Sequence, residues 1–146
     1  MNFKRTITGI GITVALSLTM ALTAGCSPEE KPLPTVEDVT VQLGSESTVQ
    51  GAIDNSVVVS WSPSRDSRVE GYAIYRAEQG LGVEVTEKSE FALQAITVAT
   101  YYIDDEVRTS LRYPSMRYFY QVAVITSGTV TGPMSPELSI EYTAAP

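Results

Sequence analysis

Short runs of β-branched and aromatic residues, separated by turn residues, are the feature that most constrains the fold of this chain. Val39, Val41 and Leu43 alternate with polar residues, and a period of two is typical of a half-buried strand. Similar runs follow at residues 57–61, 69–76, 91–98, 101–104, 117–125 and 137–143. No helical period extends over three turns beyond residue 34. The pattern predicts an all-β fold, a seven-stranded antiparallel β-sandwich.

The same alternation predicts which side chains form the core. Trp61 shares a face with Val57 and Val59, and Tyr72 shares a face with Ile74. The inward positions of the run at residues 117–125 are Tyr118, Tyr120, Val122 and Val124. Residues 44–56 and 128–133 are rich in turn-forming residues and are predicted to be loops.

The N-terminus has the layout of a secretory signal. Lys4 and Arg5 precede an apolar run at residues 7–22, and the small residues Thr23, Ala24 and Gly25 end it. An uncleaved membrane anchor is the alternative, because about 20 apolar residues can span a bilayer. In both cases the basic residues stay in the cytoplasm and the rest of the chain is exported.

The single cysteine of the chain, Cys26, comes directly after this segment. The sequence Thr23-Ala24-Gly25-Cys26 resembles the signal of bacterial lipoproteins, in which the cysteine receives a diacylglycerol and becomes the first residue of the mature protein. The resemblance implies a signal peptide at residues 1–25, a lipid anchor on Cys26 and a proline-rich tether at residues 26–34. It also implies transport to the outer membrane where the host has two membranes, because Ser27 rather than aspartate follows the cysteine.

Several motifs within residues 35–146 resemble the fibronectin type III family. Residues 57–61, 71–76, 101–104, 113–125 and 132–140 correspond to its strands B, C, E, F and G. Trp61 and Tyr72 match its aromatic core pair, and Pro114 precedes Tyr118 by four residues, as at the family's tyrosine corner. The resemblance implies an immunoglobulin-like sandwich in which the Tyr118 hydroxyl bonds the backbone upstream. Arg112 replaces the family's leucine, which implies a repacked corner, and residues 77–90 imply a long loop after strand C.

Composition excludes several classes of function. Removal of residues 1–25 takes away Lys4 and Arg5, which leaves eight basic and 17 acidic residues and a net charge of −9. Such a surface repels phosphate backbones, so we expect no nucleic-acid partner. The chain has no histidine, its only cysteine is Cys26, and it contains no nucleophile elbow or phosphate-binding loop. We therefore expect no catalysis and no cofactor.

Two sets of residues remain as candidates for a site. The acidic run of Asp104, Asp105 and Glu106 could bind calcium, but it lacks the spacing and the glycine of a calcium loop, so a capped and solvated strand end is the favoured interpretation. The aromatic residues predicted at outward or loop positions are Tyr75, Tyr101, Tyr113 and Phe119. Two or three of these on one sheet face would form a candidate binding surface.

The sequence favours a membrane-anchored bacterial lipoprotein that displays one fibronectin type III domain as a non-catalytic binding or scaffolding module. Its partners would be the membrane, through the lipid on Cys26, and an envelope protein or glycan. One alternative is an assembly or accessory factor of a secretion, pilus or glycan-processing system, which accepts a strand at an open sheet edge. Another is a glycan hydrolase with paired carboxylates, for which a single sandwich offers little concavity.

Overall fold

The computed structural model describes residues 31–127, 129–130 and 132–143. The predicted signal peptide and Cys26 lie outside these residues. The chain from Lys31 onward forms one compact unit, so residues 31–34 of the predicted tether are part of it. None of the described residues belongs to a helix that is long and apolar enough to cross a membrane.

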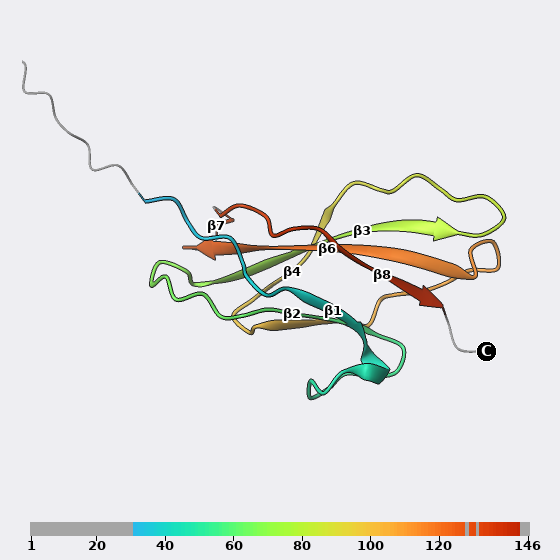
Figure 1. Cartoon of the computed structure of the whole chain (residues 1–146), viewed down its shortest axis with the longest axis horizontal. Helices are drawn as coiled ribbons and strands as arrows, with labels where there is room; N and C mark the ends of the chain where they lie inside the picture. The colour runs from blue at the N-terminus through green and yellow to red at the C-terminus, as the bar shows by residue number, and fades with distance from the viewer. Residues whose placement is uncertain (1–30, 128, 131, 144–146) are drawn as a thin grey trace, which may run out of the picture. The chain divides into compact units, whose positions relative to one another are not determined.

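The described strands form two antiparallel sheets that pack as layers (Figure 1). The smaller sheet has the order β1-β2-β5, from β1 (Thr40–Leu43), β2 (Val57–Ser60) and β5 (Tyr101–Asp104). The larger sheet has the order β4-β3-β6, from β4 (Ala92–Thr97), β3 (Gly71–Leu81) and β6 (Ser115–Thr126). Both β7 (Thr129–Val130) and β8 (Leu138–Thr143) pair with β6, and a short 3-10 helix, η1 (Gly44–Glu46), follows β1.

The last strand of the sandwich is interrupted. β7 pairs with Ile125 and Thr126, and β8 pairs with residues 115–120, so the two together accompany the length of β6. Ser127, which follows β6, has a φ of 50°, in the left-handed region that is common in turns between paired strands. The prediction of a loop at residues 128–133 was therefore wrong for Thr129 and Val130, whereas Gly128 and Thr131 lie outside the described residues.

The predicted core positions are confirmed. The buried cluster between the sheets contains Trp61 and Tyr72, with their rings edge to face at 5.3 Å, together with the inward residues of β2, β3 and β6: Val57, Val59, Ile74, Tyr118, Tyr120, Val122 and Val124. Val39, Val41 and Leu43 pack against this cluster while half-buried. These contacts confirm the predicted immunoglobulin-like sandwich and the strand registers on which it depends.

The two long strands define two ends of the domain. At one, which we call the near end, Gly71 pairs with Ile125, and the loop of residues 61–70 joins β2 to β3. At the other, the far end, Leu81 pairs with Ser115. The far end also carries the loop of residues 82–91 and the corner of residues 105–114, at the right of Figure 1. Because β3 and β6 are longer than β2 and β5, they extend beyond the smaller sheet at this end.

Candidate binding surface

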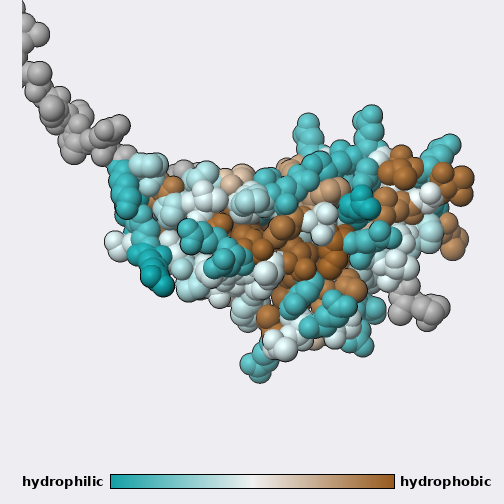
Figure 2. Space-filling view, in the orientation of Figure 1, coloured by the Kyte–Doolittle hydropathy of each residue, from teal (hydrophilic) through white to brown (hydrophobic). Residues whose placement is uncertain are grey.

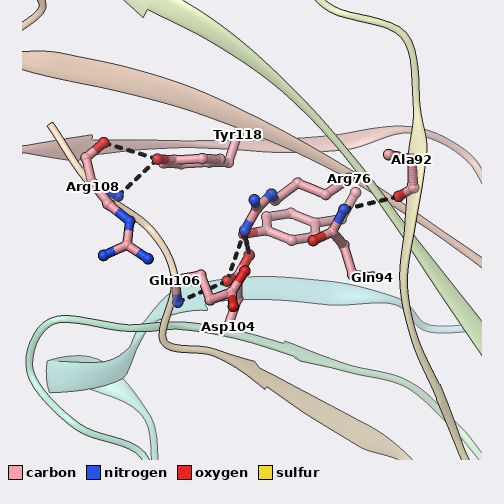
Figure 3. Close-up of polar contacts among 8 residues, drawn as sticks. Arg76, Ala92, Gln94, Asp104, Glu106, Arg108 and Tyr118 are labelled. Atoms are coloured by element: carbon pink, nitrogen blue, oxygen red, sulfur yellow. Dashed lines mark hydrogen bonds and ion pairs between the residues drawn. The ribbon is translucent and has the colours of Figure 1, made fainter.

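The acidic run is solvated only in part. The side chain of Asp104 is completely buried, and it accepts hydrogen bonds from Arg76 Nη1 at 2.9 and 2.7 Å (Figure 3). The Tyr120 hydroxyl donates to the same carboxylate at 2.8 Å. Asp104 also accepts a bond from the backbone N–H of Glu106 at 3.1 Å, so the predicted capping role is correct, and the predicted solvation is wrong for Asp104 alone. Asp105 and Glu106 are exposed. No cluster of three or more metal-ligating residues occurs in the described part of the chain, which gives the calcium alternative no support.

The Arg76–Asp104 pair joins the two sheets, since Arg76 lies on β3 and Asp104 on β5. The Arg76 guanidinium also lies over the Tyr118 ring, 5.5 Å from its centroid. Burial alone would lower the pKa of Arg76, but the hydrogen bond and charge of Asp104 more than offset this and raise it. Burial and the charge of Asp104 raise the pKa of Tyr120, which keeps its hydroxyl protonated and able to donate. We interpret this cluster as a structural link between the sheets.

The tyrosine corner is present as the family resemblance implied. The Tyr118 hydroxyl donates to the carbonyl of Arg108 at 2.8 Å and accepts from the backbone N–H of the same residue at 2.8 Å (Figure 3). Arg112, at the position of the family's leucine, is exposed and lies over the ring of Tyr113. The Tyr113 ring packs on Gly80, where a Cβ would come within 2.7 Å of it. The repacked corner is thus filled by Tyr113, which leaves little room for any residue larger than glycine at position 80.

A cleft of about 570 Å³ opens at the far end, between the corner and the overhanging part of β3 and β6. Carboxylates and guanidinium groups both line it, and its charged residues are Arg76, Glu78, Glu87, Glu106 and Arg108. Arg76 is engaged by Asp104 at its base. The mixture of charges favours neither an anion nor a cation, so the cleft gives no indication of a ligand class.

The four outward aromatic residues do not form one cluster. Tyr75 and Phe119 both lie on the outward side of the larger sheet, where Tyr75 pairs with Gln121 and Phe119 pairs with Ala77. Tyr101 pairs with Ser60 in the smaller sheet, on the opposite side of the domain, and Tyr113 lies in the corner. The predicted surface is therefore reduced to the pair of Tyr75 and Phe119, both half-buried.

A β-bulge in β4 adds two aliphatic side chains to this pair. The partners of β3 shift by one residue between Ile74 and Tyr75, so that Ala95 pairs with Ile74 and Leu93 pairs with Tyr75. Gln94 is the extra residue, and its side-chain amide donates to the carbonyl of Ala92. Ile96 pairs with the outward residue Ala73, and Leu93 and Ile96 therefore face the same side although they are three residues apart.

We call the surface formed by Tyr75, Leu93, Ile96 and Phe119 the outer apolar face. Leu93 and Ile96 are 49% and 53% exposed, whereas three alanines beneath them, Ala73, Ala77 and Ala123, are buried. One edge of the face is covered by Lys88, whose ammonium lies 4.9 Å from the Phe119 ring centroid and bonds the Glu137 carboxylate at 2.7 Å. The face itself carries no charged side chain, in a chain with a formal net charge of −7.

Apolar side chains also reach the surface elsewhere. In Figure 2 they gather along the line between β1 and β8 and at the right-hand end, beyond β3. The residues of β1 and β8 along that line, among them Val41 and Ile140, are half-buried and belong to the packed core. Beyond β3, Val83 and Val85 are exposed, and Leu111 of the corner is fully exposed. These residues lie in loops, whereas those of the outer apolar face lie on three paired strands, β4, β3 and β6.

Comparison with known proteins gives a distant structural match. No family model matches the chain, and no curated protein matches it. A similar solved structure is the third fibronectin III domain of the human KIAA0343 protein, which is 19% identical, with a TM-score of 0.47 over 82% of this chain and 90% of that one. The strand order described above is that of a fibronectin type III sandwich. Fold alone does not determine function.

Proposed function

We propose that this protein is an exported, lipid-anchored module that binds another envelope protein through the outer apolar face. The observation that carries the proposal is the exposure of the apolar side chains of Leu93 and Ile96, which a β-bulge places on the same sheet face. Contiguous exposed apolar surface on a soluble domain is typical of interaction sites. Export and anchoring through Cys26 rest on the N-terminal sequence, and the mature domain binds without catalysing a reaction.

The composition of the face favours a protein over a glycan. Sugars are bound on open aromatic rings, but Tyr75 and Phe119 are both half-buried, and Lys88 covers Phe119. The more exposed side chains of the face, Leu93 and Ile96, are aliphatic and suit the apolar centre of a protein interface.

The edges of the larger sheet disfavour the alternative of a strand acceptor. The bulge at Gln94 interrupts regular pairing along β4, which is one edge of this sheet. Pro136 precedes β8, where it cannot donate to a new strand. Bulges and prolines are devices that protect sheet edges from pairing. A partner that docks on the face of the sheet needs no free edge.

The interface is tested in cells by photo-crosslinking of the full-length chain. A photoreactive residue at Ile96 should give a defined adduct with one envelope protein, and a photoreactive residue at Tyr101, on the opposite sheet, should not. The double variant Leu93→Ser/Ile96→Ser should lose binding of the identified partner. Leu111→Ser, which changes an even more exposed apolar residue at the corner, should keep it. Equal adducts from positions 96 and 101, or binding that survives the double variant, would contradict the proposal.

The anchor is tested separately. In a bacterium fed a clickable fatty acid, the wild-type chain should acquire the label, and the Cys26→Ala variant should not. Label on the variant would exclude Cys26 as the lipidation site. A purified domain that turns over cell-wall or polysaccharide substrates, with loss of turnover on substitution of one carboxylate, would refute the non-catalytic role.

A further inference from the structure

The chain enters the domain through a clamp at the near end. Arg68, in the loop between β2 and β3, donates from Nη1 to the carbonyl of Lys31 at 2.6 Å and from Nη2 to the carbonyl of Pro32 at 3.2 Å. The Asp66 carboxylate holds the same guanidinium by bonds of 3.0 Å from Nε and 2.6 Å from Nη2. The planar guanidinium thus joins the entering segment to the loop in a fixed geometry.

The entering segment, residues 31–34, offers hydrogen-bond acceptors, and Arg68 offers donors. Pro32 and Pro34 have no backbone N–H, so residues 31–34 offer mainly carbonyl acceptors and are poorly suited to a sheet ladder. An arginine side chain has only donors. The hydrogen bonds of Arg68 hold the pKa of Asp66 well below its usual range, so the carboxylate remains charged at any pH near neutrality. Leu33 packs against the core immediately after the clamp, and Val36 is buried in it.

The short chain between Cys26 and the clamp limits how far the near end can lie from the lipid anchor. Five residue steps lead from Cys26 to Lys31, and an extended chain spans at most about 3.6 Å per step, or about 18 Å in all. β6 has 12 residues and a rise of about 3.3 Å per residue, so the far end lies roughly 40 Å from the near end. Without the clamp, Leu33 would be the first residue held against the core, seven residue steps after Cys26, and the reach would grow to about 25 Å.

We propose that the Arg68–Asp66 clamp fixes the near end of the domain toward the membrane, so that the sandwich stands upright with its far end outward. This inference rests on the proposed anchor at Cys26. The loop of residues 61–70 then faces the lipid headgroups and is not available to a partner. The outer apolar face stands at the side of the domain, accessible to a neighbouring envelope protein, and Val83 and Leu111 are farthest from the bilayer.

The clamp itself is tested without a lipid. In a soluble chain with Cys26→Ser, an introduced cysteine at Glu30 is the only thiol and therefore the only site of spin labelling. The label should be immobilised, because Arg68 holds the neighbouring residues Lys31 and Pro32. Arg68→Met should increase the mobility of the label several-fold. Arg65→Met, which removes the same charge from an exposed arginine of the same loop, should leave it unchanged. A label that is equally mobile in all three chains would refute the clamp, and Trp61 fluorescence would verify folding of each variant.

The orientation is tested on the acylated chain in membranes. A fluorophore on a cysteine at Ser67 should transfer energy to a headgroup acceptor several-fold more efficiently than one at Val83, and Arg68→Met should reduce the difference. Equal transfer from the two positions in the clamped protein would overturn the orientation. If the wild-type chain instead failed to associate with membranes, the proposed anchor would be wrong and the clamp measured in solution would stand.

Discussion

Loss of the Asp104 carboxylate should destabilise the domain more than any other single polar substitution. Replacement by alanine leaves three donors without their acceptor: the Arg76 guanidinium, the Tyr120 hydroxyl and the backbone N–H of Glu106. The Arg76 side chain is only 15% exposed and cannot recover its hydration fully. Removal of one partner from a buried ion pair costs about 3–5 kcal/mol. A domain commonly has about 5–15 kcal/mol of unfolding free energy, so Asp104→Ala should be close to unfolding.

A double-mutant cycle isolates the pair from the rest of the site. Arg76→Met should also cost several kcal/mol, because it leaves the buried carboxylate with only the Tyr120 and Glu106 donors. The double variant Arg76→Met/Asp104→Ala should cost less than the sum of the single changes, with a coupling of about 0.5–3 kcal/mol. Urea unfolding of residues 27–146, followed by the fluorescence of Trp61, the only tryptophan, measures all three. If each single variant lost less than about 1 kcal/mol of unfolding free energy, or if the two losses simply added in the double variant, the pair would be hydrated and would not link the sheets.

Three further predictions concern the core and the corner. Trp61→Ala should cost about 3–5 kcal/mol, because a buried aromatic side chain is removed; a denaturant midpoint that barely moves would place Trp61 outside the core. Tyr118→Phe should cost about 1–3 kcal/mol, because the N–H and carbonyl of Arg108 both lose their partner, and a loss below that range in urea unfolding would show that water replaces the hydroxyl. Alkali should destabilise the domain. Burial, followed by the charge of Asp104, raises the pKa of Tyr102 from 10.0 to about 12, so the stability from its neutral form is present below pH 10 and lost as the pH rises toward 12. Melting temperatures should be constant up to pH 9 and then fall, less steeply in Tyr102→Phe, and equal slopes in the two chains would refute a role for this residue.

The parts of the fold that could be predicted are those that local pattern determines. A period of two places Val57, Val59 and Trp61 on one face wherever the strand pairs, and the spacing of Pro114 and Tyr118 specifies a corner made by neighbouring segments. The Arg76–Asp104 pair could not be found in this way, because its members are 28 residues apart and lie on different sheets. Their side chains meet only after the sheets have packed.

The candidate surface was predicted only in part, because half of it also depends on how the strands pair. Tyr75 and Phe119 were assigned to outward positions by alternation, which the register confirms. Leu93 and Ile96 are three residues apart, so strict alternation assigns them to opposite faces, and only the bulge at Gln94 brings them together. Bulges depend on the pairing partner as well as on the strand, and sequence alternation alone therefore could not predict the two most exposed residues of the face.

The clamp could not be predicted from the sequence either. In residues 31–32, Arg68 binds only backbone carbonyls, and backbone groups leave no motif in the sequence.

Stability and binding should be separable because they use alternate positions of the same strands. On β6, Tyr118 points into the core and its neighbour Phe119 points to the outer apolar face. On β4, Ala95 packs against the core and its neighbour Ile96 points to the outer apolar face. Exposed substitutions usually change the unfolding free energy by less than about 0.5 kcal/mol, so Ile96→Ser should leave the urea midpoint unchanged while it weakens the partner complex. Tyr118→Phe should do the opposite, because it removes a corner bond that no partner can reach. If both variants lost binding only in proportion to the unfolded fraction, the outer face would have no role of its own, and the binding site would have to be sought at the far end, around Val83 and Leu111.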